Sequence, residues 1–183
     1  KDVTSKLVND LESLLLSLGM PNAKFKIDIN SSDSFLSNGK DIISFLLKAN
    51  KGGEFLVLKK GASGGELSRI MLAVKYILSK HHQLPTIIFD EIDSGVSGEI
   101  SNKIASIMKE MSNYMQVLTI THQPQIAAKG LHHFKVFKLD TDISTNTQLK
   151  LLSSADRLEE IAQMLAGDQV TKSAIAHAEE LLN

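Results

Sequence analysis

The spacing of apolar residues predicts that the chain begins with an amphipathic helix. Between residues 3 and 18, a valine and several leucines follow one another in steps of three and four, which places them on one stripe of a helix. The same spacing is typical of the last turns of a coiled coil, and an ordinary amphipathic helix packed on the domain would explain it equally well. Gly19 and Pro21 predict the end of this helix.

The next segment has the alternation of a half-buried strand. Apolar and lysine or aspartate residues alternate over residues 24–29, and two further strands are expected at residues 42–47 and 54–58. Residues 31–40 are polar and predict a turn-rich connection. Three neighbouring strands with short polar links favour an antiparallel patch.

The pattern changes after residue 60. A loop of small residues at 61–65 leads into a helical pattern at 66–80, and a second helical pattern covers residues 98–112. The apolar runs at 85–90 and 115–120 are typical of strands buried on both faces. Helix and strand therefore alternate, which predicts an α/β fold with a mainly parallel sheet flanked by helices. A closing hairpin and two helices are expected at residues 134–139, 148–152, 155–165 and 171–182.

Composition narrows the classes of protein that fit. The 183 residues are 43% hydrophobic, which suits one compact domain, and the net charge of -1 gives no global attraction to nucleic acid. The absence of cysteine excludes disulfides and cysteine metal sites. No apolar run approaches the roughly 20 residues of a membrane helix, and the first ten residues lack the apolar core of a signal peptide. We expect a cytoplasmic protein with no membrane partner.

The loop before the second helical pattern is a candidate phosphate-binding element. Ser63, Gly64, Gly65 and Glu66 stand at the start of that helix, where free N–H groups and a partial positive charge attract anions. Glycine lacks the Cβ that would keep a phosphate at a distance. A tight turn, with Ser63 as the helix N-cap, is the simpler interpretation of the same residues.

Two carboxylates follow the first apolar run. Asp90 and Glu91 come at the carboxyl end of the predicted strand, the edge at which ligands bind in open α/β sheets. Asp90 suits Mg²⁺ or a magnesium-bound water, and Glu91 could act as the general base for an attacking water. A solvated loop start or a helix cap is the alternative for such a pair.

Two more groups follow the predicted strands. Ser94 and Gly95 lie in a short turn just beyond Asp90 and Glu91, and Ser97 could cap the next helix. His122 follows the second apolar run, so it should reach the same sheet edge and could hydrogen-bond a terminal phosphate and the attacking water. A lone histidine is more often structural, and no histidine pair has convincing metal-ligand geometry.

The order of these motifs resembles the C-terminal lobe of an ABC-type ATPase head. In that family the stretches at 62–66, 86–91 and 94–95 would be the signature motif, Walker B and D-loop, and His122 would be the switch histidine. Ala62 departs from the leucine that ABC proteins prefer at the start of the signature.

A finer resemblance is to the RecN family of DNA repair proteins, relatives of the SMC proteins. It covers roughly residues 25 to 183. It rests on the stretches Asn38–Glu54, Gly61–Arg69, Ile88–Gly98, Thr121–Ala127 and Arg157–Gly167.

The resemblance implies an ATPase head that works as a homodimer around two ATP molecules. Asp90, Glu91 and His122 would serve one site with Mg²⁺, whereas residues 63–65 would reach the γ-phosphate held by the second head and residues 94–95 would bridge the two. Such a protein would act on DNA, near the nucleoid, in double-strand-break repair and recombination.

The resemblance also implies that the head is split in sequence by a coiled coil. The chain contains no G-x-x-x-x-G-K-[ST] loop, so an N-terminal lobe would have to supply it, and we expect no ATP hydrolysis from this chain alone. Residues 1–20 would be the end of the coiled coil or an amphipathic helix, and residues 21–183 the C-terminal lobe. Another SMC-type or ABC-type head, including a transporter subunit, or a non-catalytic interaction module, remains an alternative.

Overall fold

The structure divides into two compact units, which end at Thr119 and Asn183. It is a computed structural model, and it describes residues 2–81, 84–96, 98–140, 144–167 and 169–183. The predicted helix cap Ser97 and part of the predicted turn after residue 139 lie outside the described residues.

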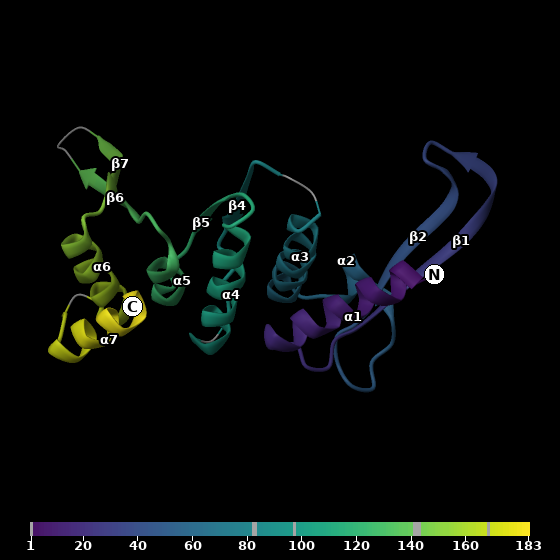
Figure 1. Ribbon diagram of the computed structural model, residues 1–183, viewed down its shortest axis with the longest axis horizontal. Helices are drawn as coiled ribbons and strands as arrows, with labels where there is room; N and C mark the ends of the chain where they lie inside the picture. Colours follow the sequence, from purple (N-terminus) through teal and green to yellow (C-terminus); the bar gives the residue numbers. More distant parts are fainter. Residues whose placement is uncertain (1, 82–83, 97, 141–143, 168) are drawn as a thin grey trace. The chain divides into compact units, whose positions relative to one another are not determined.

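The first unit contains most of the helices and strands that the pattern predicts (Figure 1). In chain order they are α1 (Asp2–Ser17), β1 (Lys24–Leu36), β2 (Gly39–Lys48), β3 (Leu56–Val57), α2 (Leu58–Gly61), α3 (Gly64–Ser79), β4 (Thr86–Asp90), α4 (Gly98–Met111) and β5 (Gln116–Ile120), whose last residue is the first of the second unit.

The first helix is buried on one stripe in its second half only. Leu11, Leu15 and Leu18 are buried, where α1 packs on α3 and β1, whereas Val3 is 79% exposed. Gly19 ends the helix with a φ of 77°, a conformation that favours glycine. The predicted helix is thus confirmed, and its first turns extend beyond the packed core.

The antiparallel patch is a sheet of three strands in the order β1-β2-β3. Its register runs from Lys24 opposite Lys48 to Ser31 opposite Asp41, and shifts before Leu36 pairs with Gly39. The predicted turn at 31–40 was therefore too long, because β1 continues to Leu36 and β2 begins at Gly39. The strand expected at residues 54–58 was also too long, since β3 has two residues and α2 follows at once.

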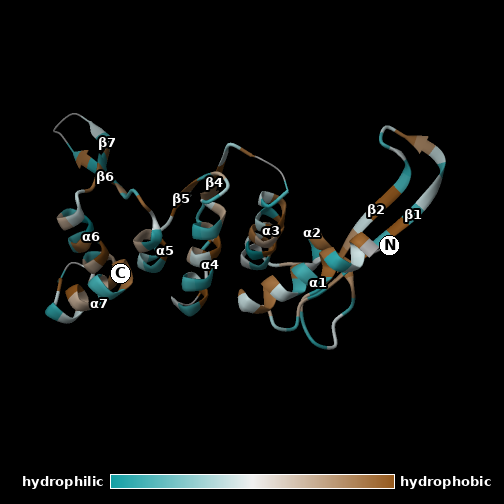
Figure 2. Cartoon of the chain, in the orientation of Figure 1, coloured by the Kyte–Doolittle hydropathy of each residue, from teal (hydrophilic) through white to brown (hydrophobic). Residues whose placement is uncertain are grey.

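The strands β4 and β5 are neighbours in a two-stranded sheet, and they are less buried than predicted. Phe89 is buried, but Ile88 is 64% exposed, Leu118 44% and Ile120 57%. Figure 2 shows the apolar character of these strands. The prediction of burial on both faces is wrong for this chain by itself, because two strands offer too little neighbouring structure to cover both faces.

The second unit holds the predicted hairpin and helices, and one further helix. Its elements are α5 (Pro124–Lys129), β6 (Phe134–Asp140), β7 (Thr145–Leu151), α6 (Ser154–Ala166) and α7 (Lys172–Leu182). The three helices pack on one another around a small core of Ala128, Ile161, Ala162, Ala174 and Ala178 (Figure 1). Within the described residues, no helix is long and apolar enough to cross a membrane.

Candidate functional site

The candidate phosphate loop is a capping box at the start of α3. The Ser63 backbone N–H and hydroxyl both donate to Glu66 Oε2, at 2.8 and 2.9 Å, and the Glu66 N–H donates to Ser63 Oγ at 3.4 Å. The N-cap role of Ser63 is therefore confirmed. Gly64 and Gly65 occupy the first two helical positions, whose N–H groups have no acceptor within the helix.

The space around the two glycines differs. A Cβ placed on Gly64 would meet no atom within 4 Å, whereas one on Gly65 would lie 3.4 Å from the Ser94 carbonyl oxygen. The structure thus brings the predicted signature loop beside the predicted D-loop. Gly64 keeps an open side from which a phosphate could reach the backbone.

The turn after β4 carries the two predicted carboxylates. Asp90 ends the strand and Glu91 follows it, and both side chains are exposed. Glu91 has a φ of 46°, in the left-handed region, and its carbonyl accepts the Ser94 N–H at 3.2 Å. Such a conformation costs a residue with a Cβ about 1–2 kcal/mol. The backbone of this turn is therefore strained at Glu91.

These carboxylates fit part of a magnesium site. Among the described residues, no group of three His, Cys, Asp or Glu side chains could hold a metal ion by itself. Magnesium needs no such cage, because it usually takes one or two carboxylates and fills its other positions with water and substrate phosphates. The exposed Asp90 carboxylate fits that pattern.

The sequence pattern did not predict the roles of two residues near the site. Asp93 is completely buried within the turn after β4, and nothing in the local pattern indicates this. Arg69 donates from Nε to the Gly65 carbonyl at 3.2 Å and from Nη1 to the Leu18 carbonyl at 3.3 Å. The four-residue spacing from Gly65 to Arg69 on a helix was the available signal for the first contact. Arg69 therefore ties the end of α1 to the first turn of α3.

His122 lies in the second unit, between β5 and α5. Its side chain is exposed, and its Nε2 lies 3.4 Å from the side-chain nitrogen Nε2 of Gln123. The Gln123 N–H donates to Thr121 Oγ1 at 2.9 Å, which fixes the backbone of this short loop. A shared edge for His122 and Asp90 would join the two units, so it stays a prediction.

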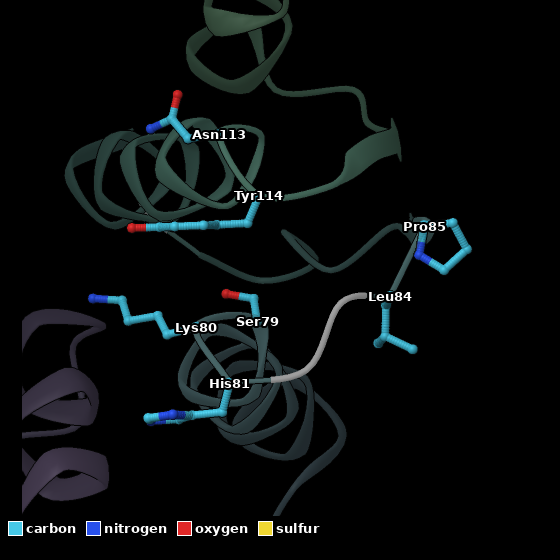
Figure 3. Close-up of a pocket in the computed structure, with 7 residues that line it drawn as sticks. All are labelled: Ser79, Lys80, His81, Leu84, Pro85, Asn113 and Tyr114. Atoms are coloured by element: carbon cyan, nitrogen blue, oxygen red, sulfur yellow. The ribbon is translucent and has the colours of Figure 1, made fainter.

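A pocket among the described residues lies away from the predicted site. It has a volume of about 610 Å³ and lies at the carboxyl ends of α3 and α4, with Pro85 at the start of β4 on its wall (Figure 3). It is therefore at the opposite end of β4 from Asp90. Lys80, on its wall, donates to the Tyr76 hydroxyl at 2.8 Å and lies 3.2 Å from Glu110. The lysine charge is thus already paired, which leaves little to attract a phosphate.

Sequence comparison relates the chain to DNA repair protein RecN. The chain is 38% identical over 180 residues to RecN of Haemophilus influenzae, covering 98% of this chain and 32% of that protein. It is 41% identical over 181 residues to RecN of Rickettsia conorii, covering 99% and 33%. The chain thus spans about a third of the length of these curated relatives. No protein-family model matches the chain.

Structural comparison relates the fold to SMC heads. The Smc head domain with a coiled coil and joint from Pyrococcus yayanosii matches 87% of this chain and 29% of that chain, with a TM-score of 0.67 at 19% identity. A chain from a study of ATP-driven dimerisation and DNA-stimulated activation of SMC ATPases matches 92% and 96%, with a TM-score of 0.56 at 19% identity. The chain is therefore related to the RecN proteins over nearly its whole length, and it has the α/β fold of an SMC-type head.

Proposed function

We propose that this chain is the C-terminal half of the ATP-binding and ATP-hydrolysing head of a RecN-like protein that acts in DNA double-strand-break repair and recombination. The identity to RecN over almost the entire chain supports this proposal. The observation that carries it is the meeting of two predicted motifs in space, since Gly65 of the signature loop lies against Ser94 of the D-loop.

The candidate residues divide the work of hydrolysis. Bound Mg²⁺ would neutralise phosphate charge as it develops. Asp90 would hold that ion or one of its waters, and Glu91 would accept a proton from the attacking water. His122 would donate a hydrogen bond to the terminal phosphate. The exposure of all three side chains leaves them accessible to a nucleotide.

The signature loop would act on the nucleotide of a second head. Ser63, Gly64 and Gly65 offer a hydroxyl and backbone N–H groups, but the chain has no phosphate loop of its own to hold a nucleotide against them. A homodimer of heads would bring the loop to the partner's ATP. One SMC neighbour comes from work on ATP-driven dimerisation, which supports this arrangement.

An N-terminal lobe of the same protein would complete the head. The relatives are three times as long as this chain, and Ile88, Leu118 and Ile120 expose apolar surface that such a lobe could cover. The exposed start of α1 supports residues 1–20 as the end of a coiled coil and residues 21–183 as the lobe itself. A DNA repair role would place the protein in the cytoplasm, on the nucleoid.

The substitution Glu91→Gln in the full-length protein tests this proposal. It removes the general base but keeps the size of the side chain, so ATP turnover should fall by about 10²–10⁴-fold. ATP-driven association of heads should persist, which size-exclusion chromatography with and without ATP would measure.

A matched substitution provides the control. Glu179→Gln changes an exposed glutamate of α7 and should leave both turnover and association at the wild-type level. A Glu91→Gln protein that neither binds ATP nor associates would assign Glu91 a structural role. Normal turnover in that protein would favour an interaction module whose motifs do not catalyse.

A further inference from the structure

The loop that carries His122 continues directly into a helix too short to be stable alone. Helix α5 spans Pro124–Lys129, and its N-cap Gln123 makes no side-chain capping bond. Isolated helices shorter than about 12 residues are marginal in water. The position of α5, and of the loop joined to it, must therefore come from contacts with the rest of the second unit.

Arg157 of α6 makes several polar contacts at the carboxyl end of α5. Its Nη2 donates to the carbonyl oxygens of Ala128 and Gly130, both at 2.6 Å, and lies 3.4 Å from the carbonyl oxygen of Ala127. These carbonyls lie at the carboxyl end of α5 and its C-cap, where the helix has a partial negative charge; the Ala127 carbonyl also accepts the Gly130 N–H at 3.3 Å. One guanidinium nitrogen thus contacts three carbonyl oxygens at the carboxyl end of the helix.

The position of Arg157 is itself fixed. It directly follows a capping box in which Ser153 Oγ accepts the Asp156 N–H at 3.2 Å, and its own N–H donates to the Ser153 carbonyl at 2.8 Å. Burial lowers the pKa of the Arg157 guanidinium below its ordinary value, although arginine stays charged in proteins. A partly buried cation needs acceptors, and the α5 carbonyls provide them.

We infer that Arg157 is a positioning residue for His122. It holds the carboxyl end of α5, so that the helix and the Thr121–Gln123 loop keep one orientation, while it touches neither nucleotide nor His122 itself. This inference rests on the proposed function, because it gives His122 a task whose efficiency depends on geometry. A displacement of about 1 Å in a positioned group can cost 10²-fold in rate.

The test compares Arg157→Met and Arg157→Lys in the full-length protein. Arg157→Met keeps the apolar stem but removes the donors, so kcat for ATP should fall about tenfold or more while KM and ATP-driven association stay near wild type. Arg157→Lys keeps a charged donor on a head group of different shape, and should lose less. Unfolding would lower apparent kcat and ATP-driven association together, so a graded loss of kcat with wild-type association is the result that distinguishes positioning.

A double-mutant cycle with His122→Ala separates positioning from independent effects. If Arg157 acts through His122, Arg157→Met should add little further loss in the His122→Ala background. The control Lys129→Ala removes the bond from Lys129 Nζ to the Leu181 carbonyl, at 3.1 Å, on the exposed side of the same helix end, and should leave kcat unchanged.

The outcomes distinguish this inference from the proposed function. Wild-type kcat in either Arg157 variant, or fully multiplicative losses with His122→Ala, would overturn the positioning role. An inactive wild-type protein, or a His122→Ala protein with full activity, would instead contradict the proposed function. If Arg157→Met does not fold, the Arg157→Lys variant decides the inference by the same criteria.

Discussion

The first turn of α3 and the carboxyl end of β4 both carry predicted site residues, but their backbones are stabilised in opposite ways. Ser63 and Glu66 satisfy one another through a capping box, and Gly64 and Gly65 sit in ordinary helical positions. Glu91 instead has a left-handed φ and an exposed side chain without a hydrogen bond or ion pair in the described part of the chain.

This difference indicates how far local sequence determines the backbone conformation of each region. The start of α3 is determined by local sequence and would form without any ligand. The turn after β4 holds Glu91 at a positive φ although its side chain makes no hydrogen bond or ion pair with the described residues, and such strain is common where a side chain must be aimed at a ligand. A substitution that removes function without harming stability should therefore be easiest to find in these two places.

Of three further effects, the largest is on activity, from Gly64→Ala. The added Cβ meets no protein atom, and alanine is the better helix former, so the free energy of unfolding should stay the same or rise by up to ~1 kcal/mol. The methyl group would, however, stand between the backbone N–H groups and a phosphate, and ATP turnover of the full-length protein should fall about 10²-fold.

Urea unfolding and steady-state turnover would measure the two effects separately. Ser106→Ala, at an exposed position of α4, serves as the control: it also gains helix propensity, so stability should stay the same or rise slightly, but turnover should not change. A Gly64→Ala protein with wild-type turnover would show that the start of α3 is only a structural cap.

The next effect is on stability, from Glu91→Gly. Glycine adopts a positive φ without strain, and part of that gain is lost to its greater freedom in the unfolded chain. We expect Glu91→Gly to be about 1 kcal/mol more stable than Glu91→Gln, although neither should hydrolyse ATP. Chemical denaturation of the two variants measures the difference, and equal stabilities would contradict the strain assigned to this turn.

The smallest effect concerns His133 in the second unit, where Nδ1 is buried without a partner in the described part of the chain. Burial and then the positive charges of Arg157 and Lys135 lower the pKa of His133, against a smaller opposing effect of Glu160. The unfolded chain therefore binds a proton more readily, so this contribution to stability is complete above pH 6.5 and is lost as the pH falls from 6.5 through the lowered pKa.

Urea unfolding as a function of pH measures this effect. His133→Asn should flatten the loss of stability below pH 6.5, whereas His132→Asn, at an exposed neighbouring position, should not. An unchanged pH slope in His133→Asn would show that other groups dominate the acid sensitivity of the second unit.

The sequence predicted those features that short segments determine. The Ser63 cap, helix α3 and the strand that ends at Asp90 follow from local spacing and capping chemistry. The exposure of Ile88 could not be predicted, because burial of a strand depends on which neighbours cover it. The contacts of Arg157 with α5 span up to 30 residues of sequence and leave no local pattern. The candidate residues Asp90, Glu91 and His122 came from motif order, and their roles stay predictions.

The central claim is that the α3 loop serves a second head while Glu91 serves its own, and mixing two inactive full-length variants tests it directly. Each of Gly64→Ala and Glu91→Gln should be nearly inactive alone. After exchange of subunits, a mixed dimer keeps one site with both an intact loop and an intact Glu91, so turnover should recover to about a quarter of wild type for random pairing. No recovery on mixing, with mixed dimers shown to form, would contradict the account.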